Sequence, residues 1–177
     1  RTNYRCHQGV LSVANFCVEM MQLFPNSVDA IEPERAHFAG AAPLLFLDDD
    51  FNDVADVFSG GHTVSDFGAN QVIIVRDEAA KRSLPAQLAG ALAMTPLEAK
   101  GLEFADVFAW NFFQDSAAPD RAWGAAAHEI GCPGDAAAAF DARTHLVLSD
   151  ELKQLYVACT RARERLVFFD QSATARK

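Results

Sequence analysis

Three short segments of the chain hold residues whose types and spacing could do chemistry. They are Asn3-Tyr4-Arg5, the stretch 95–104 and the stretch 155–163. Splitting a nucleoside triphosphate requires positive charge where negative charge builds on the transferred phosphoryl group, and an arginine supplied across a domain cleft is the usual source. Arg5 and Arg161 are the candidates for that role.

The stretch 155–163 belongs to a predicted helix that Ser149 can cap and that runs to about residue 163. At about 100° per residue, the apolar stripe of this helix consists of Leu152, Leu155, Tyr156 and Cys159. Arg161 points away from the stripe, so we expect it to face out of the core; a solvated surface arginine is the alternative. Arg163 turns back toward the stripe as a snorkelling or salt-bridging residue, and Cys159 is expected to be a packing residue rather than a nucleophile.

The other elements are predicted from hydrophobic periodicity. Helices are expected over 9–24, 51–58 and 77–89, the last with a possible break at Pro85. Strands are expected over 43–47, 71–75, 91–95, 106–112 and 165–170. The strand 71–75 is apolar on both faces, which is typical of a buried parallel sheet.

Strands that alternate with helices predict an α/β domain with a mainly parallel sheet, whose ligand edge lies at the carboxyl ends of the strands. The domain is expected to span 1–170, with a partly helical insertion near 115–148 and a polar tail over 171–177. Gly101 allows a tight turn after a strand at the cleft edge, where a Cβ could obstruct the approach of the backbone to a ligand.

The order of the three segments and the α/β frame around them resemble motifs IV, V and VI of UvrD/Rep-type superfamily 1 helicases. The resemblance covers most of the chain. Its most specific parts are Lys100-Gly101-Leu102-Glu103-Phe104 and Tyr156-Val157-Ala158-Cys159-Thr160-Arg161-Ala162. Within that family, the residues 97–104 and the following Asn111-Phe112-Phe113 look most like the helicase-like region of large eukaryotic tetratricopeptide-and-ankyrin-repeat proteins.

The resemblance implies a second RecA-like domain, of the P-loop NTPase type, that contributes to an ATP site. Arg161 and Arg5 correspond to arginine fingers, Tyr4 to the aromatic residue that stacks on adenine, and Glu103 to a glutamate near the nucleotide sugar. Gly101 lies in the same nucleotide-binding segment. The alternatives are a half-buried structural tyrosine for Tyr4 and a surface ion pair for Glu103.

The resemblance also implies contacts with single-stranded nucleic acid, either DNA or RNA. Thr95 and Lys100 correspond to the nucleic-acid side, where a hydroxyl or an ammonium group can hold a backbone phosphate; Lys100 could instead be structural. The chain departs from the family at Leu97, because UvrD/Rep proteins usually carry a histidine two residues after the threonine. The aromatic residues after the fourth predicted strand could stack on bases, but in this position they are more often core residues. They are Trp110, Phe112 and Phe113.

Parts of an ATPase are missing from the sequence. It contains neither a GxxxxGK[ST] phosphate loop nor the acidic motif that holds magnesium. We therefore expect a fragment of a longer protein, inactive when isolated. An upstream RecA-like domain of the same protein would complete the site for ATP and hold its Mg²⁺.

Two other functions are compatible with the sequence. The first is a degenerate helicase fold that serves as a non-catalytic binding or scaffold module in a large repeat protein; Leu97 and the acidic charge favour it, and the intact Arg161 and Glu103 oppose it. The second is a free-standing nucleotide-binding α/β protein, which the absence of a glycine-rich βα turn disfavours.

Composition sets further limits. The 177 residues include 15 Lys and Arg against 24 Asp and Glu, a net charge of −9, which argues against a broad nucleic-acid-binding surface but allows a local basic groove. The four cysteines form no CxxC pair, which indicates free thiols in a reducing compartment such as the nucleus or cytoplasm. No apolar run is long enough for a membrane span. No metal site is predicted: Asp48-Asp49-Asp50 is interpreted as a solvated loop, and the five histidines have no ligand spacing.

Overall fold

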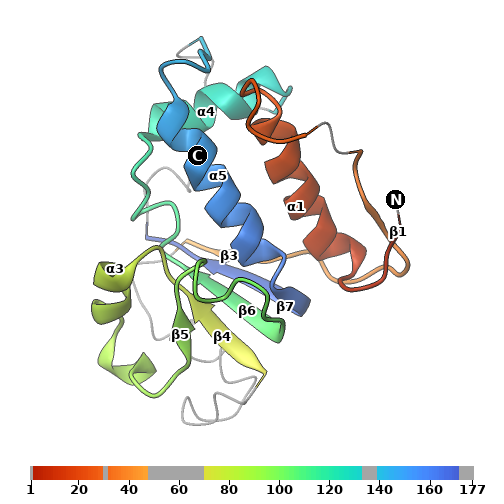
Figure 1. Cartoon of the computed structure of the whole chain (residues 1–177). Coiled ribbons are helices and arrows are strands. Elements are labelled where there is room, and N and C mark those ends of the chain that lie inside the picture. The colour runs from red at the N-terminus through yellow and green to blue at the C-terminus, as the bar shows by residue number, and fades with distance from the viewer. Residues whose placement is uncertain (1, 30–31, 48–69, 133–138, 172–177) are drawn as a thin grey trace.

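The structure of the protein is a computed structural model that describes residues 2–29, 32–47, 70–132 and 139–171. Five strands form one parallel sheet in the order β3-β7-β6-β4-β5 (Figure 1). They are β3 (Leu44–Phe46), β4 (Gln71–Ile74), β5 (Ala93–Met94), β6 (Phe104–Trp110) and β7 (Ala162–Phe169). Two short strands, β1 (Thr2–Asn3) and β2 (Arg35–Ala36), form a second parallel pair. The predicted α/β class, a mainly parallel sheet flanked by helices as in a RecA-like domain, is confirmed.

The central strands are buried on both faces because successive side chains point to opposite sides of the sheet. In β4, Val72 and Ile74 pack into one hydrophobic cluster, whereas Ile73 and the following Val75 pack into another. All four side chains are fully buried, and burying each one contributes roughly 1.5–3 kcal/mol. The prediction of a buried parallel strand over 71–75 is confirmed.

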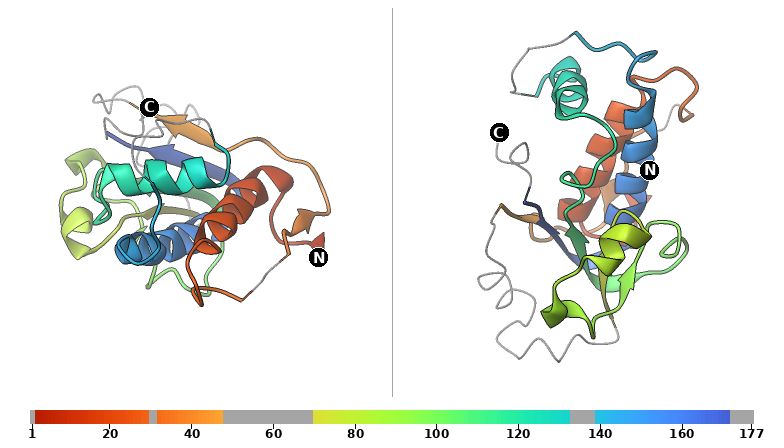
Figure 2. Two further views of the ribbon diagram at one scale, coloured as in Figure 1. Left: turned by 90° about the horizontal axis from the view of Figure 1, so that it is seen from above. Right: turned by 90° about the vertical axis from the view of Figure 1, so that its left-hand side faces the viewer.

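Helices cover both faces of the sheet (Figures 1 and 2). The first face is covered by α1 (Gln8–Met21), α4 (Asp120–Glu129) and α5 (Leu146–Cys159), with α1 and α5 packed against each other. The opposite face is covered by α3 (Glu78–Arg82) and the 3₁₀ helix η2 (Ala86–Leu88), which bury Ala80 and Leu88. None of the described helices has the length and apolarity that a membrane span requires.

The beginning of α1 is fixed by His7. Its Nδ1 atom accepts hydrogen bonds from the backbone N–H groups of Gly9 (3.1 Å) and Val10 (3.4 Å), so the imidazole acts as the N-cap. Its Nε2 atom contacts the carbonyl oxygen of Glu164 in β7 and must donate, because a carbonyl oxygen can only accept. His7 therefore anchors the segment that carries Tyr4 and Arg5 to the central sheet.

Two predicted helices differ from the structure. The helix expected over 77–89 is interrupted at Pro85, which has no backbone N–H and disfavours helical geometry in the residue before it. The cap predicted at Ser149 is wrong: α5 begins at Leu146, and Ser149 is a buried residue inside the helix, with its hydroxyl 2.8 Å from that of Ser27. Leu148 is fully buried, so its packing draws the helix one turn further toward the N-terminus.

Other boundaries move by a few residues. The strands predicted over 91–95, 106–112 and 165–170 correspond to β5, β6 and β7, and the predicted insertion near 115–148 contains α4 and the start of α5. The predictions for Asp48-Asp49-Asp50, for the helix over 51–58 and for most of the tail over 171–177 lie outside the described residues.

Candidate functional site

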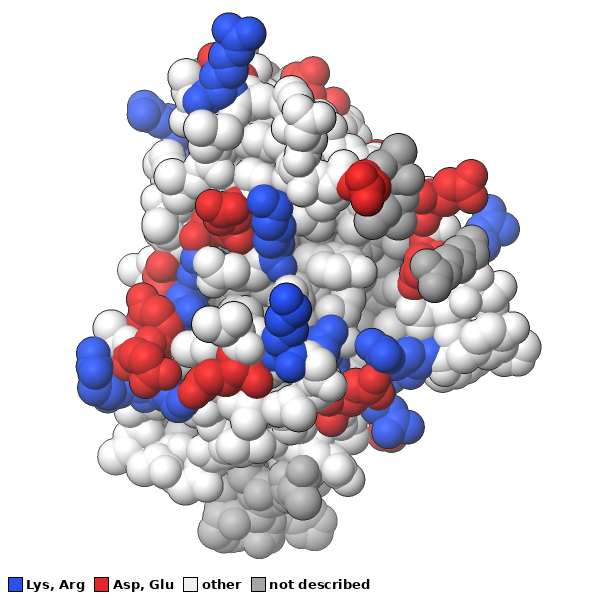
Figure 3. Space-filling view, viewed as in Figure 1, with Lys and Arg blue, Asp and Glu red and all other residues white. Residues whose placement is uncertain are grey.

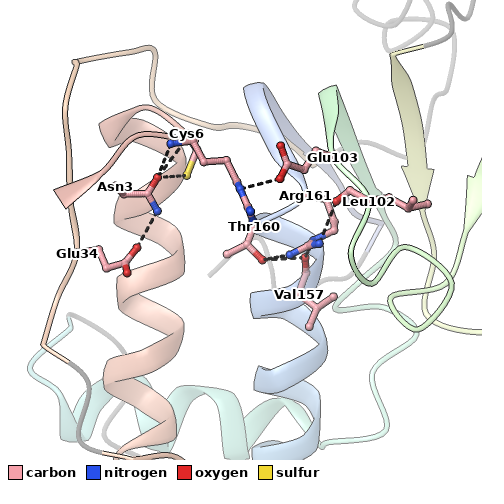
Figure 4. Close-up of polar contacts among 9 residues, drawn as sticks. Asn3, Cys6, Glu34, Leu102, Glu103, Val157, Thr160 and Arg161 are labelled. Atoms are coloured by element: carbon pink, nitrogen blue, oxygen red, sulfur yellow. Dashed lines mark hydrogen bonds and ion pairs between the residues drawn. The ribbon is translucent and has the colours of Figure 1, made fainter. Parts of the chain in front are cut away.

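A pocket of about 450 Å³ lies between the N-terminal segment 2–6 and the C-terminal end of α5 (Figure 4). Its volume is within the range of roughly 300–1,000 Å³ that is typical of small-molecule sites. It is lined by Thr2, Asn3, Tyr4, Arg5, Cys6, Leu11, Glu34, Tyr156, Thr160 and Arg161. The fold thus brings the two predicted arginines and the predicted tyrosine, from opposite ends of the chain, to one cavity.

Asn3 organises the segment that carries Tyr4 and Arg5. Its Oδ1 atom accepts hydrogen bonds from the backbone N–H groups of Arg5 (2.8 Å) and Cys6 (3.2 Å), and its Nδ2 atom donates to Oε2 of Glu34 (2.7 Å). An asparagine that accepts from N–H groups two and three residues ahead is a common way to shape a turn. Sequence reasoning missed this role, although an asparagine just before the two candidate residues was the available signal.

Arg5 forms an ion pair with Glu103, with 2.7 Å between Nε and Oε1. The side chains are 52% and 35% exposed, so both groups are partly in contact with solvent. Glu103 therefore does form the surface ion pair that we considered as the alternative, and its partner is a candidate catalytic residue. Three segments that are distant in sequence meet here: the N-terminal turn, the residue before β6 and the end of α5 (Figure 4).

Arg161 faces out of the core as expected, but it is not on the helix, so the predicted extent of the helix to about residue 163 is wrong. Helix α5 ends at Cys159, and Arg161 lies in the turn that leads into β7. Its guanidinium group donates to the carbonyl oxygens of Val157 (3.0 Å) and Leu102 (2.9 Å) and to Oγ1 of Thr160 (3.1 Å). These bonds fold the side chain back over the helix end, where it is half-buried and still lines the pocket.

The pKa of Arg161 is lowered, first by burial and then by the nearby positive charge of Arg5, while Glu103 acts in the opposite direction. The two guanidinium groups are therefore close enough to repel each other, and Glu103 partly offsets this repulsion. An anion bound between the two guanidinium groups would also offset this repulsion. Positive charge is thus concentrated where Arg5 and Arg161 approach each other, beside the carboxylate of Glu103.

Arg163 also differs from the prediction. It belongs to β7 rather than to the helix, and its side chain is exposed instead of returning to the apolar stripe. Cys159, by contrast, is fully buried at the end of α5, and its pKa is raised by a hydrogen bond with Cys17 and by burial. The interpretation of Cys159 as a packing residue is confirmed.

Tyr4 is exposed, with 73% of its surface accessible, so the alternative of a half-buried structural tyrosine is wrong. Its ring centroid lies 5.3 Å from that of His37, at an interplanar angle of 34°. The pocket therefore has an accessible aromatic ring at its rim, and its surface is available for stacking.

Thr95 is engaged in a local structure that the sequence analysis did not recognise. Its hydroxyl accepts a hydrogen bond from the backbone N–H of Glu98 (3.3 Å), and the carboxylate of Glu98 accepts one from the backbone N–H of Thr95 (2.8 Å). This reciprocal pair is a capping box, whose signature T-x-x-E was readable in the sequence. The pKa of Glu98 is lowered by the Thr95 N–H and by Lys81, whose ammonium group lies 3.0 Å away.

Gly101 adopts a left-handed conformation with φ of 86°, so the turn before β6 requires a glycine. A Cβ built at this position would meet no protein atom within 4 Å, so the requirement is conformational rather than steric. The turn places the carbonyl oxygen of Leu102 where Arg161 donates to it. Gly101 thus helps to position Arg161, while direct contact with a nucleotide stays a prediction.

The candidate residues lie at opposite edges of the sheet. Glu103 and Arg161 directly precede β6 and β7, so they lie at the amino ends of these parallel strands, and the expectation of carboxyl ends is wrong for them. Thr95 follows β5 and lies at the carboxyl edge. Neither Thr95 nor the exposed Lys100 lines the pocket.

The aromatic residues at the end of β6 and just after it belong mainly to the core. Trp110 and Phe112 are buried, and Trp110 stacks on Phe169 with 4.3 Å between the ring centroids. Phe113 is partly buried and contacts Trp123 edge to face. The interpretation as core residues is confirmed for Trp110 and Phe112. In the part of the chain that the structure describes, no three His, Cys, Asp or Glu side chains come together as a metal site would require.

Fold and pocket together define an α/β domain with an arginine-lined cavity at the amino edge of its sheet. No protein-family profile matches the chain. It is 36% identical, over 199 aligned residues, to the human TPR and ankyrin repeat-containing protein 1. The alignment covers 98% of this chain but only 7% of that protein. This similarity agrees with the resemblance seen in residues 97–113.

Among solved structures, the chain is similar to the C-terminal domain of a possible DNA helicase from Lactobacillus plantarum WCFS1. The two are 18% identical, the match covers 98% of this chain and 92% of the other, and the TM-score is 0.45.

Proposed function

We propose that the chain is the second RecA-like domain of a UvrD/Rep-type superfamily 1 helicase or translocase. In this proposal it supplies Arg161 and Arg5 as arginine fingers to an ATP site. The observation that carries the proposal is the convergence of Tyr4, Arg5 and Arg161 at one pocket, with Glu103 paired to Arg5, because the resemblance assigns all four residues to the nucleotide.

The geometry of the pocket suits the proposed role. The two guanidinium groups provide positive charge for the phosphates, and three hydrogen bonds orient that of Arg161 before any ligand arrives. Tyr4 offers its exposed ring to the adenine. The phosphate loop and the residues that hold Mg²⁺ would come from an upstream RecA-like domain of the same protein, in the nucleus or cytoplasm.

Single-stranded nucleic acid is the proposed second ligand, and Lys100 is its best-placed contact on segment 95–104. Lys100 is exposed, whereas the Thr95 hydroxyl already takes part in the capping box. Leu97, 81% exposed, presents an apolar side chain where UvrD/Rep proteins usually have a histidine. On the face seen in Figure 3, Lys and Arg side chains lie among Asp and Glu, which favours a narrow path for the strand over a broad basic surface.

The proposal is tested by measuring ATP hydrolysis in the full-length protein with and without single-stranded DNA and RNA. We expect hydrolysis that one of the two nucleic acids stimulates, and no hydrolysis by the isolated domain. Absence of hydrolysis in the full-length protein, with the fold intact, would instead support the non-catalytic scaffold function.

A further inference from the structure

The pocket contains an acidic residue that the proposed roles do not use. Glu34, just before β2, lines the cavity together with Arg5 and Arg161. Burial contributes most to the raised pKa of Tyr156, and the negative charge of Glu34 contributes next. The same charge also helps to raise the pKa of Cys6. Both of these residues line the pocket. Arg5 also acts on Cys6 and Arg161 on Tyr156, so the cavity combines two cations with a carboxylate.

Glu34 is held in place by two asparagines. Its backbone N–H donates to Oδ1 of Asn15 (3.1 Å), and its carbonyl oxygen accepts from Nδ2 of Asn15 (2.8 Å). Its carboxylate accepts from Nδ2 of Asn3 (2.7 Å), the residue that also shapes the turn carrying Arg5. A side chain fixed from both the backbone and the carboxylate loses little conformational entropy when it binds a ligand, which is typical of a binding residue.

The sugar of a nucleotide offers hydrogen-bond donors, and an ionised carboxylate is a pure acceptor. Carboxylates accept from ribose hydroxyls in other nucleotide-binding folds. Glu103, to which the resemblance assigned the sugar, is not among the residues that line the pocket, whereas Glu34 is the acidic side chain among the described residues that does line it.

We propose that Glu34 is a specificity-determining residue that accepts hydrogen bonds from the ribose hydroxyls of the nucleotide whose phosphates bind Arg5 and Arg161. This inference rests on the proposed function, because it assumes that the pocket takes a nucleotide. Its consequence is discrimination between a ribonucleotide and a nucleotide whose sugar lacks hydroxyls.

The test compares the dissociation constants of ATP and 2′,3′-dideoxy-ATP for the full-length protein and three variants. A hydrogen bond to a charged group corresponds to roughly 10- to 100-fold in affinity, so wild-type protein should bind the dideoxy nucleotide more weakly by about that factor. In Glu34→Gln this gap should shrink to roughly threefold or less. Glu32→Gln, which removes the same charge from an exposed position two residues away, should keep the full gap.

Several outcomes would overturn the inference while leaving nucleotide binding intact. One is a wild-type protein that binds both nucleotides equally, and another is a gap that Glu34→Gln leaves unchanged. Equal weakening of both nucleotides in Glu34→Gln would indicate a structural role, which its melting temperature would reveal independently. A gap that closes in Glu103→Gln instead would assign the sugar to Glu103. If the wild-type protein binds neither nucleotide, the proposed function itself fails, and the inference with it.

Discussion

The Nε atom of Arg5 lies 2.7 Å from Oε1 of Glu103, and this pair joins the N-terminal turn to the turn before β6. Both side chains are partly exposed, and such pairs contribute only about 0–1 kcal/mol to stability. The main effect of the ion pair is therefore to hold these two turns in position. Glu103 also acts on the charge of Arg161, so one carboxylate partly balances two guanidinium groups that would otherwise repel each other.

Replacing Arg161 by alanine should abolish most of the proposed ATP hydrolysis. The loss of an arginine that stabilises phosphoryl-transfer charge typically lowers turnover by about 10³-fold or more. Arg163→Ala is the matched control, since it removes the same charge from an exposed position of β7 two residues away. Turnover should be measured in the full-length protein together with its circular dichroism spectrum; a normal rate in a folded Arg161→Ala variant would exclude the arginine-finger role.

Asp106 should make stability depend on acid pH. In the register of the sheet it lies opposite Arg165, which donates to both of its carboxylate oxygens (2.7 and 2.6 Å), while Gln71 donates from the other neighbouring strand (2.8 Å). Burial by itself raises the pKa of Asp106, but the hydrogen bonds from Arg165 and Gln71 outweigh it, and the net pKa is lowered. Because the folded pKa lies below the unfolded one, the stabilisation is present above about pH 4 and is lost as the pH falls through the folded pKa.

Asp106→Asn should accordingly lower the free energy of unfolding by about 1 kcal/mol at pH 7, a value reduced by solvent screening of the exposed Arg165. The variant should also flatten the dependence of stability on pH below about pH 4. Urea denaturation between pH 2 and 7 measures both effects. Asp150→Asn, at a site where the side chain is 76% exposed, should leave the acid dependence as in the wild type; an equal response of both variants would contradict the assignment.

Gly40→Ala should destabilise the protein by roughly 1–3 kcal/mol, the usual cost of overpacking. A Cβ at Gly40 would overlap the imidazole ring of His7, which caps α1 and holds it against β7. Gly90→Ala is the control, because a Cβ there would have no protein atom within 4 Å. Urea denaturation of both variants measures the difference, and equal stability would show that the His7 region can move aside at little cost.

The sequence allowed prediction of elements in which local pattern and tertiary environment agree. The strand 71–75 is apolar on both faces, and it is buried on both faces in the parallel sheet. The start of α5 could not be predicted in the same way, because Ser149 has the local chemistry of a cap while the burial of Leu148 extends the helix beyond it. Tertiary packing therefore determines where α5 begins, and the local sequence pattern of the helix does not show this.

The identities of the pocket residues were predictable, but their connections were not. Tyr4, Arg5 and Arg161 were chosen by residue type and resemblance, and they line one pocket. Arg161 does face out of the core, but the helical-wheel argument for this was wrong, because it assumed that the helix continues past Cys159. Glu34 was missed altogether, since its place in the pocket depends on hydrogen bonds to Asn3 and Asn15, two residues at least nineteen positions away.

The most severe loss of stability should come from breaking the buried ion pair between Arg76 and Glu151. The side chains are only 6% and 4% exposed, Ser116 donates to the second carboxylate oxygen of Glu151 (2.7 Å), and the guanidinium of Arg76 lies 4.8 Å from the ring centroid of Phe112. Glu151→Ala would leave a buried cation without its counter-charge, which costs about 3–5 kcal/mol. The double variant Arg76→Met with Glu151→Leu removes both charges and should recover most of that loss, because well-packed apolar residues often replace a buried pair without penalty. Denaturation of Arg76→Met, Glu151→Leu and the double variant measures the coupling; if the double variant loses the sum of the two single losses, the two charges do not depend on each other and the assignment is wrong.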